Sequence, residues 1–597
     1  MRKGMICAPQ PEAVEVGADV LERGGNAFDA AIACAFAQGV VDNLMCGIGG
    51  FGFAQVYSAA DGVHTSYDFM STAPAATRPG MWEDLLEGET RDGFGFILRG
   101  RVNDVGYRSV AVPPMLRGYH AIHARFGRLP WADVVAPAVA LAEGGYTVTP
   151  FVRNYWVTPE RMGRVEIIDR IAHSPVARPL YFDATGQPHP VGAKVRNPDL
   201  ARTLSTIARD GIEAFFSGSI AARIEEDFRA HGGLLSRADL ESCRATERPV
   251  IRGSYRGWEV AVPAPPASGL MLLQMLGTLE RFDLAALGFN SPDYIALLAE
   301  VMKRAQVDKE RLIGDPDFAP VPHGPFVDAA AHDAAAAAIR SGERAVVPRI
   351  APKAAESADT THLSVVDREG NIVSMTHTLG MQSGVVTPGL GFMYNAAMAM
   401  FDPRPGRAMS LAPGKKRVSS MAPSILFRDG RPAMVIGAPG GSNIPMGILQ
   451  VILNVVDFGM SIVEAVDAPR VAATGNVVDA SHRIPTRTCE ALRARLRRRA
   501  FGAELPRRAP PRDPARGQLP HRRRRPLRGR HGAAGLTRWR RGGAANSRRA
   551  SPGPCPRIAA WRSIAASTRR CGGRSPRAAG RPGIRCRARR ASARASA

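Results

Sequence analysis

The chain has 597 residues, enough to bury a large core, and a formal net charge of +25. This charge is confined to one segment, because residues 491–597 carry +30 while residues 1–490 carry −5. The distribution excludes a generally basic, nucleic-acid-binding fold for residues 1–490. The sequence has no apolar run long enough to span a membrane and no signal-peptide pattern at Met1, so it predicts a cytoplasmic protein. A periplasmic or secreted location stays open if the N-terminus is truncated.

Two helices are expected near the N-terminus, at about residues 11–23 and 27–41, with Gly24-Gly25 ending the first. A glycine-rich run at residues 47–50 then precedes an apolar strand at residues 51–57. The spacing of these glycines fits neither GxGxxG nor a Walker motif, so they do not predict a phosphate loop.

The middle of the chain, from about residue 113 to residue 340, is mostly helical by pattern. The clearest helical candidates in the chain beyond residue 113 are residues 135–143, 293–308, 329–339 and 445–458. Residues 341–359 are predicted to be an exposed linker. The cysteines show neither metal-type spacing nor the density of a disulfide framework.

Residues 359–379 read as two short strands, rich in Val, Ile and Thr, joined by a loop that contains Arg368-Glu369-Gly370. A three-residue hairpin loop with glycine at its left-handed position is a common connection. A hairpin centred near Glu369 would place Thr378 opposite Thr360, with their hydroxyls side by side where the first strand begins. Such a pair is ordinarily a contact between β-branched strand residues, so the residues alone leave its role open.

The segment Asp359-Thr360-Thr361-His362 resembles the start of the small subunit in the γ-glutamyltransferase family, a branch of the N-terminal-nucleophile hydrolases. Residues 24–53 likewise resemble the opening of that family's large subunit. The resemblance implies an α+β fold, a four-layer αββα sandwich over about residues 4–490.

The same resemblance implies a precursor that cuts itself between Asp359 and Thr360. Thr360 would then be the nucleophile, with Thr378 orienting its hydroxyl. A threonine hydroxyl needs an adjacent base. The α-amine released by the cut, with a pKa of about 7.7 to 8, would be such a base on the same residue.

The resemblance also assigns substrate contacts. Arg78, together with Ser419 and Ser420, would hold a carboxylate of the substrate, and a planar guanidinium suits that bidentate contact. Gly440 and Gly441 would hold the oxyanion through their backbone N–H groups at a helix N-terminus. Without the resemblance these residues would be a loop arginine, a serine pair and a glycine-rich turn.

Departures from the family pattern bear on the substrate. Gly380 stands where the transferases have Asn, and Met400 stands where they have the carboxylate that binds the α-ammonium of a γ-glutamyl group; Ala397 replaces a neighbouring Gln. An ammonium buried against methionine would lack a charged partner, which is costly. Together with the short segment at residues 401–419, these departures resemble the amidohydrolase and acylase-like branch and favour an open site where water resolves the acyl-enzyme.

The sequence therefore predicts an amide hydrolase or acyltransferase that acts on a carboxylate-bearing amide, with water or an amine as acceptor and no metal or organic cofactor. The expected parts are a large-subunit region (1–359), a small-subunit region (360–490) and an Arg-rich tail (491–597) that is disordered or frameshift-derived. One alternative is a true γ-glutamyltransferase acting on glutathione. The other is an inactive chain whose tail binds nucleic acid.

Overall fold

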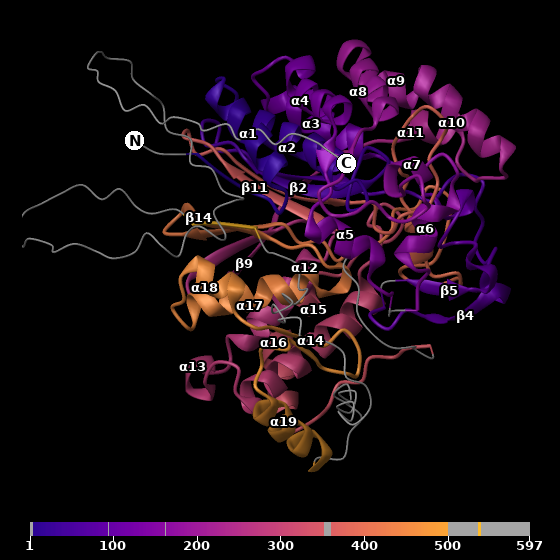
Figure 1. Cartoon of the computed structure of the whole chain (residues 1–597). Coiled ribbons are helices and arrows are strands. Elements are labelled where there is room, and N and C mark those ends of the chain that lie inside the picture. The colour runs from indigo at the N-terminus through magenta and orange to yellow at the C-terminus, as the bar shows by residue number, and fades with distance from the viewer. Residues whose placement is uncertain (1–3, 94, 161–162, 351–359, 499–534, 539–597) are drawn as a thin grey trace, which may run out of the picture.

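The computed structural model describes residues 4–93, 95–160, 163–350, 360–498 and 535–538. Two antiparallel sheets lie face to face, and helices cover the outer face of each sheet (Figure 1). This order of helix, sheet, sheet and helix is the four-layer αββα sandwich that the sequence predicts.

The strands of the first sheet follow the order β1 (Met5–Cys7), β11 (Thr361–Val366), β12 (Ile372–Thr378), β2 (Phe51–Tyr57), β3 (His64–Phe69) and β8 (Thr246–Pro249). Those of the second sheet follow the order β17 (Gly535–Arg538), β14 (Arg431–Gly437), β13 (Ser424–Arg428), β10 (Trp258–Val262) and β9 (Ile251–Tyr255). Short ladders pair β4 (Leu86–Glu89) with β5 (Phe96–Leu98), β6 (Tyr146–Thr147) with β7 (Lys194–Val195), and β15 (Val471–Ala472) with β16 (Asp479–Ala480).

The helices on the side of the first sheet include α1 (Pro11–Glu22), α2 (Ala27–Val41), α3 (Met115–Phe126), α4 (Trp131–Gly144) and α8 (Pro198–Asp210). Those on the side of the second sheet include α12 (Gly269–Leu279), α14 (Pro292–Leu312), α15 (Gly324–Val327), α16 (Ala329–Arg340), α17 (Ile444–Val456), α18 (Ile462–Asp467) and α19 (Thr486–Arg498). The remaining α-helices are α5 (Pro150–Val157), α6 (Ile167–His173), α7 (Arg178–Tyr181), α9 (Glu213–Phe216), α10 (Ser219–Ala230), α11 (Arg237–Ser242) and α13 (Leu284–Leu287).

Apolar side chains fill the spaces between these layers. One large cluster lies between the first sheet and its helices, and another lies between the second sheet and its helices. A smaller cluster lies between the two sheets and contains Ala261, Val366, Ile372, Ile425, Phe427 and Val435. Alternate residues of β11 and β12 therefore face opposite layers, as the two-residue period of a strand requires.

Local sequence determines where α2 begins. The Asn26 side chain accepts hydrogen bonds from the backbone N–H groups of Phe28 and Asp29, and the Asp29 carboxylate accepts one from the Asn26 N–H. This reciprocal capping box satisfies donors that a helix start otherwise leaves open. The predicted helix at residues 27–41 and the predicted strand at residues 51–57 are both confirmed.

The prediction that residues 341–359 form an exposed linker is confirmed only in part for residues 341–350. They contain neither helix nor strand, and Ser341, Glu343, Val346 and Pro348 are exposed, but other positions pack against the fold. Val347 is fully buried, and its backbone exchanges two hydrogen bonds of 2.9 Å with the side chain of Asn476. Arg349 forms an ion pair with Glu310 at 2.7 Å. Composition could not reveal this packing because each partner lies far away along the chain. Residues 351–359 lie outside the described residues.

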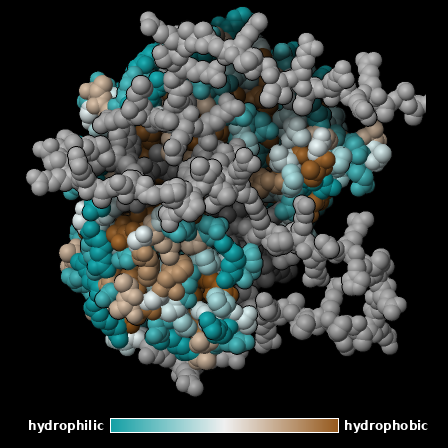
Figure 2. All heavy atoms as spheres, turned by 60° about the vertical axis from the view of Figure 1, so that its left-hand side comes forward, coloured by the Kyte–Doolittle hydropathy of each residue, from teal (hydrophilic) through white to brown (hydrophobic). Residues whose placement is uncertain are grey.

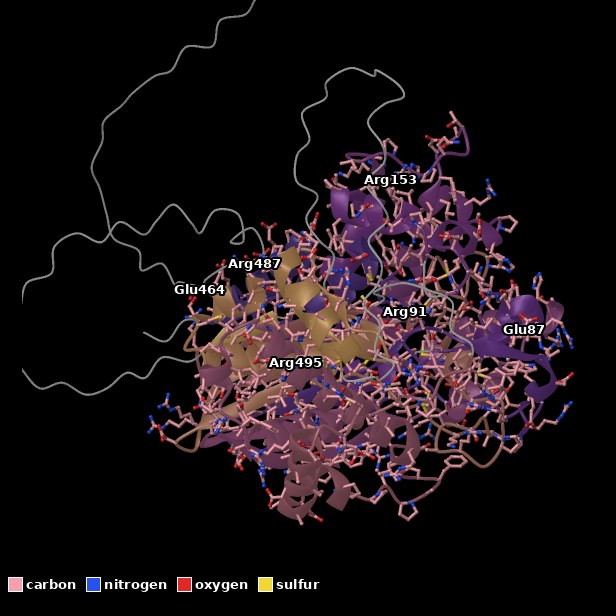
Figure 3. All side chains as sticks on the ribbon, turned by 90° about the horizontal axis from the view of Figure 1, so that it is seen from below. Glu87, Arg91, Arg153, Glu464, Arg487 and Arg495 are labelled. Atoms are coloured by element: carbon pink, nitrogen blue, oxygen red, sulfur yellow. The ribbon has the colours of Figure 1, made fainter. Side chains whose placement is uncertain are left out.

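The predicted boundary at residue 490 lies inside α19, which continues to Arg498. Leu492 is buried in the second helical layer, and Arg495 forms an ion pair with Asp293 of α14. Figure 3 labels Arg495 together with Arg487, which lies near the start of the same helix. The first residues of the Arg-rich segment are therefore part of the folded structure. Residues 499–534 and 539–597 of the predicted tail lie outside the described residues.

Hydrophilic residues alternate with smaller apolar patches on the described surface shown in Figure 2. Within the described part of the chain, no helix combines the length and the apolar character needed to cross a membrane.

Candidate active site

The β11–β12 hairpin brings Thr360 and Thr378 together. Thr361 pairs with His377 in the antiparallel ladder, so Thr360, one residue before β11, lies opposite Thr378. Both threonines are buried, with 5% and 1% of their surface exposed. The hydroxyl of Ser374, which has the same parity as Thr378, donates to the Ile436 carbonyl of β14 at 3.3 Å. The alternation of the strands therefore places both threonines on the side that faces the second sheet.

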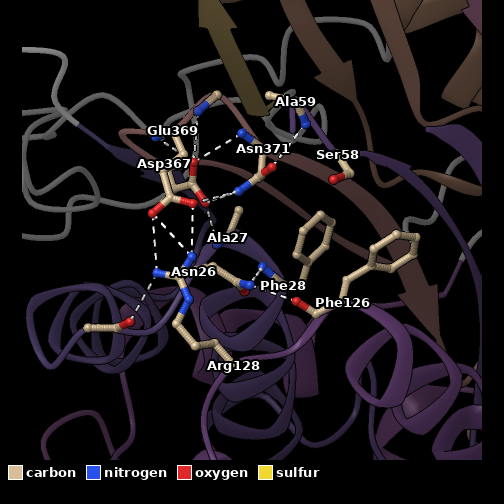
Figure 4. A network of polar contacts seen from close by, with 12 residues as sticks. Asn26, Ala27, Phe28, Ser58, Ala59, Phe126, Arg128, Asp367, Glu369 and Asn371 are labelled. Carbon is tan, nitrogen blue, oxygen red and sulfur yellow. Dashed lines mark hydrogen bonds and ion pairs between the residues drawn. The ribbon is translucent and has the colours of Figure 1, made fainter. Parts of the chain in front are cut away.

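Asp367 fixes the turn of this hairpin (Figure 4). One of its carboxylate oxygens accepts from the backbone N–H groups of Glu369, Gly370 and Asn371, at 2.9 to 3.0 Å. The other accepts from the N–H of Ala27 in the first turn of α2, at 2.9 Å. Gly370 has a φ of 100°, which confirms the predicted left-handed glycine. The hairpin is thus tied to the start of α2.

The hairpin face toward α2 carries a closed polar network. The Gln38 amide donates to the Thr361 hydroxyl at 2.9 Å and to Gln10 at 2.6 Å. His377 contacts Gln38 through Nε2 at 2.9 Å and the Tyr119 hydroxyl through Nδ1 at 2.6 Å. Burial lowers the pKa of His377 to about 3, so its ring is neutral at physiological pH. Both ring nitrogens have partners, which indicates that His377 positions the strand.

His362 links the hairpin to the second sheet. Its ring nitrogens contact the hydroxyls of Thr376 at 2.9 Å and Ser364 at 3.0 Å, and burial lowers its pKa to about 3. The ring packs so closely on Gly437 that a Cβ at that position would lie 2.1 Å from Cε1. Because Gly437 ends β14, this contact brings the segment that follows it close to the start of β11.

That segment contains Gly440 and Gly441, both with positive φ, of 131° and 54°. It continues through a short 3-10 turn, η5 (Gly441–Asn443), into α17. No described acceptor takes the backbone N–H of Gly440 or Gly441, and the buried Ser442 hydroxyl has no hydrogen-bond partner among the described residues. Open donors at a helix N-terminus can hold an anionic oxygen.

Ser419 and Ser420 lie along β2, close to the Thr378 end of the hairpin. Two contacts place them there: the Arg417 guanidinium lies 5.0 Å from the centre of the Phe51 ring, and the Gln55 amide donates to the Pro423 carbonyl at 2.6 Å. Phe51 pairs with Thr378 in the ladder between β2 and β12. The serines are therefore on the same side of the first sheet as the two threonines.

Two buried cations accompany these serines, and the sequence analysis missed both. The ammonium of Lys309 donates to the Ser420 hydroxyl at 2.9 Å. Arg417 is 3% exposed, and burial lowers its pKa to about 9. The basic run that precedes Ser419 was a usable signal for Arg417. Lys309 sits in a run of charged residues that looks like any solvated helix face.

Arg78 is exposed, and no hydrogen bond or ion pair joins it to Ser419 or Ser420 in the described structure. Its segment nevertheless lies beside theirs, because Ala73 exchanges backbone hydrogen bonds with Gly414 and Lys415. A contact between Arg78 and a substrate carboxylate stays a prediction.

Gly380 and Met400 meet beside Thr378. Gly380 has a φ of 71°, and a Cβ there would lie 2.6 Å from Met400 Cε and 2.7 Å from Phe51 Cζ. Its N–H donates to the Thr378 hydroxyl at 2.7 Å. Met400 packs with Met381 and the buried Ala396, and it lines a cavity. The side chains beside Thr378 at this point are thus apolar, while Arg101, Asp104 and Arg164 also line the cavity.

The glycines before β2 serve backbone packing. A Cβ at Gly50 would lie 2.2 Å from the Thr378 carbonyl oxygen, and Asn395 donates its N–H to the Gly49 carbonyl at 3.2 Å. Only a residue without a side chain fits against Thr378 at this point. Among the described residues, no group of three or more His, Cys, Asp and Glu side chains could hold a metal ion.

Comparison with known proteins shows the family to which the chain belongs. The family model described as Gamma-glutamyltranspeptidase matches residues 13–504. The chain is 41% identical to the Acylase ACY 1 proenzyme of Pseudomonas sp. (strain V22) over 83% of this chain and 86% of the relative. It is 33% identical to the Glutathione hydrolase proenzyme of Escherichia coli (strain K12), over 79% of this chain and 80% of the relative.

A solved structure, the cephalosporin acylase from Bacillus halodurans, is also similar. It matches with a TM-score of 0.73 and 29% identity over 85% of this chain and 90% of that chain. The family match covers more of the chain than the predicted folded part, since it extends past residue 490. The chain therefore belongs to the gamma-glutamyltranspeptidase family of amide hydrolases and acyltransferases and has the fold of the N-terminal-nucleophile hydrolases.

Proposed function

We propose that this protein is an acylase with Thr360 as its nucleophile, which hydrolyses an amide of a short dicarboxylic acid. The observation that carries the proposal is the arrangement around Thr360. Thr378 lies opposite it, and His362 holds the start of its strand against the segment that presents the N–H groups of Gly440 and Gly441.

The chemistry follows from these positions. The α-amine of Thr360 takes the hydroxyl proton as Oγ1 attacks the amide carbonyl, and Thr378 orients the attacking hydroxyl. The N–H groups of Gly440 and Gly441 stabilise the negative charge on the tetrahedral oxygen. The resulting ammonium gives its proton to the leaving amine, which leaves an ester on Thr360. Water then attacks the ester, releases the dicarboxylic acid and restores the hydroxyl.

Maturation would use the same side chain. The hydroxyl of Thr360 attacks the carbonyl carbon of Asp359, the peptide bond shifts from nitrogen to oxygen, and water hydrolyses the ester. The products are a large part that ends at residue 359 and a small part that begins with a free α-amine at Thr360. The proenzyme names of the Pseudomonas and Escherichia coli relatives support this step.

The preference for an acyl group without an α-ammonium rests on Met400. An ammonium placed among Met381, Ala396 and Met400 would lose its hydration without gaining a charged partner from them. The Asp104 carboxylate in the same cavity is already paired with Arg170. Arg78, Ser419 and Ser420 remain candidates to hold the far carboxylate. Because the chain is similar to a cephalosporin acylase, a cephalosporin with an amide-linked side chain is one substrate to test.

Two measurements test the proposal. Intact-mass spectrometry of the wild type is expected to show two fragments that separate at Asp359–Thr360, whereas Thr360→Ala gives one uncleaved chain without activity. Glutaryl-p-nitroanilide and γ-glutamyl-p-nitroanilide differ only by the α-ammonium, so we expect the wild type to prefer the glutaryl compound. A preference for the γ-glutamyl compound would instead support a glutathione-type transferase, and an uncleaved wild type would contradict the proposed nucleophile.

A further inference from the structure

Helix α14 carries two buried lysines in contrasting surroundings. Lys303 forms an ion pair with Glu300 at 2.5 Å and donates to the Ala345 carbonyl. Lys309 is 5% exposed, yet no carboxylate of the described residues lies within ion-pair distance of its ammonium. The side-chain partner of that ammonium in the described structure is the Ser420 hydroxyl, at 2.9 Å. An ammonium has three N–H donors, so this one can accept further partners.

The two carboxylates whose charges act on Lys309, those of Glu310 and Asp92, are already paired with arginines. Glu310 is held by Arg349, with both of its carboxylate oxygens at 2.7 Å from the guanidinium. Asp92 is held by Arg164 at 2.9 Å. Arg349 and Arg417 add positive charge around Lys309, and burial, the largest cause, lowers its pKa to about 8.

A buried cation without a counter-ion is costly, and an incoming carboxylate would offset that cost. We infer that Lys309 determines specificity for acidic acyl donors: its ammonium, together with the Ser420 hydroxyl, binds the terminal carboxylate of the acyl group. The inference rests on the proposed function, because it assigns the acyl-donor end of that site. It also explains how a carboxylate could be held while Arg78 stays exposed.

The kinetic test uses Lys309→Met, which keeps an unbranched side chain of similar length and removes its charge. Glutaryl-p-nitroanilide is compared with pentanoyl-p-nitroanilide, in which a methyl group replaces the carboxylate. The variant is expected to raise KM for the glutaryl compound by about 10- to 100-fold, as loss of a charge-assisted hydrogen bond predicts, with little change in kcat or in pentanoyl turnover. Lys309→Arg is expected to restore most of the affinity.

Lys303→Met on the same helix is the matched control. It removes one of the two cations paired with Glu300 among the described residues and leaves Arg344 and the Ala345 N–H, so we expect a lower melting temperature and an unchanged preference for glutaryl over pentanoyl. Lys309→Met removes an unpaired buried charge, so its melting temperature is expected to stay the same or rise. Equal losses on both substrates in Lys309→Met would overturn the inference, because they would indicate a purely structural role.

A binding experiment separates this inference from the proposed function. Glutarate binding to the purified wild type and to Lys309→Met is measured by calorimetry, which needs no turnover. We expect binding to the wild type and a loss of at least about tenfold in the variant. Equal affinities, or a wild type that does not bind glutarate, would overturn the assignment of Lys309. A wild type that binds glutarate through Lys309 but hydrolyses neither anilide would overturn only the proposed function.

Discussion

The surroundings of the two faces of the β11–β12 hairpin differ in whether their polar groups all have hydrogen-bond partners. On the face toward α2, Gln38, Thr361 and His377 bond to one another and to their neighbours in a closed network. On the face toward the second sheet, His362 is also satisfied, by Thr376 and Ser364. The segment after β14 on that side differs, because the N–H groups of Gly440 and Gly441 and the Ser442 hydroxyl lack acceptors among the described residues. Closed networks add rigidity, while open buried donors are costly unless a ligand uses them. We therefore expect the face toward α2 to hold the strand in place and the face toward the second sheet to carry the proposed chemistry.

The largest effect on catalysis is expected from a substitution at Gly437, where β14 of the second sheet packs against His362 of the first. Gly437→Ala forces a methyl group against His362 and displaces the start of the glycine segment, so we expect kcat to fall by about 100-fold. Anilide kinetics measure this fall. Gly447→Ala in α17 is the control, because a Cβ there meets nothing within 4 Å. A normal kcat in Gly437→Ala would show that the glycine segment does not depend on His362 for its position.

The next largest effect is expected from a change of pH, because it changes the charge of Lys309. The pKa of Lys309 is lowered to about 8, so its ammonium is charged at pH 7 and mostly neutral at pH 9. Glu310, Arg349, Arg417 and Asp92 are the charged groups that contribute to this pKa. The ratio of kcat/KM for glutaryl to pentanoyl anilide should therefore fall by about tenfold from pH 7 to pH 9.

Lys309→Arg provides the control for this profile, because a guanidinium keeps its charge across the range. The ratio should then change little between pH 7 and pH 9. A wild-type ratio that stays flat would contradict a role for the Lys309 charge in recognising the donor.

A smaller effect is expected from Met400→Asp, which places a carboxylate where the γ-glutamyl ammonium would lie. We expect the ratio of γ-glutamyl to glutaryl turnover to rise by about fivefold, limited by the cost of burying the new charge. Met400→Leu keeps the wall apolar and should leave the ratio unchanged. The same gain from both variants would point to altered packing instead of a new ion pair.

A substitution on the hairpin face toward α2 should affect substrate selectivity least. Gln38→Ala removes one hydrogen bond each from Gln10, Thr361 and His377 and leaves a cavity, so we expect the free energy of unfolding to fall by about 2–4 kcal/mol. Thermal melting measures that loss. The preference for glutaryl over pentanoyl anilide should remain that of the wild type; a changed preference would mean that this face also contributes to donor recognition.

The sequence predicts the hairpin and α2 well because their signals are local. The left-handed glycine at residue 370 and the capping residues around Asn26 each act within a few positions. Lys309 could not be found in this way, because a buried lysine and a solvated one look alike in a charged helical run. Its environment is created by Ser420, which lies more than a hundred positions away. The burial of Val347 could not be predicted for the same reason, because its hydrogen-bond partner Asn476 lies 129 positions away along the chain.

The order of the strands has a consequence for how such an enzyme can be made. In the first sheet, β11 and β12 lie between β1 and β2, and in the second sheet β13 pairs with β10. A cut before Thr360 would therefore divide both sheets into interleaved pieces, each with long unpaired edges on its own. Such edges favour aggregation. The two pieces, synthesised separately, should fail to reassemble, so continuity of the polypeptide acts as an internal chaperone that becomes dispensable once the sheets have closed.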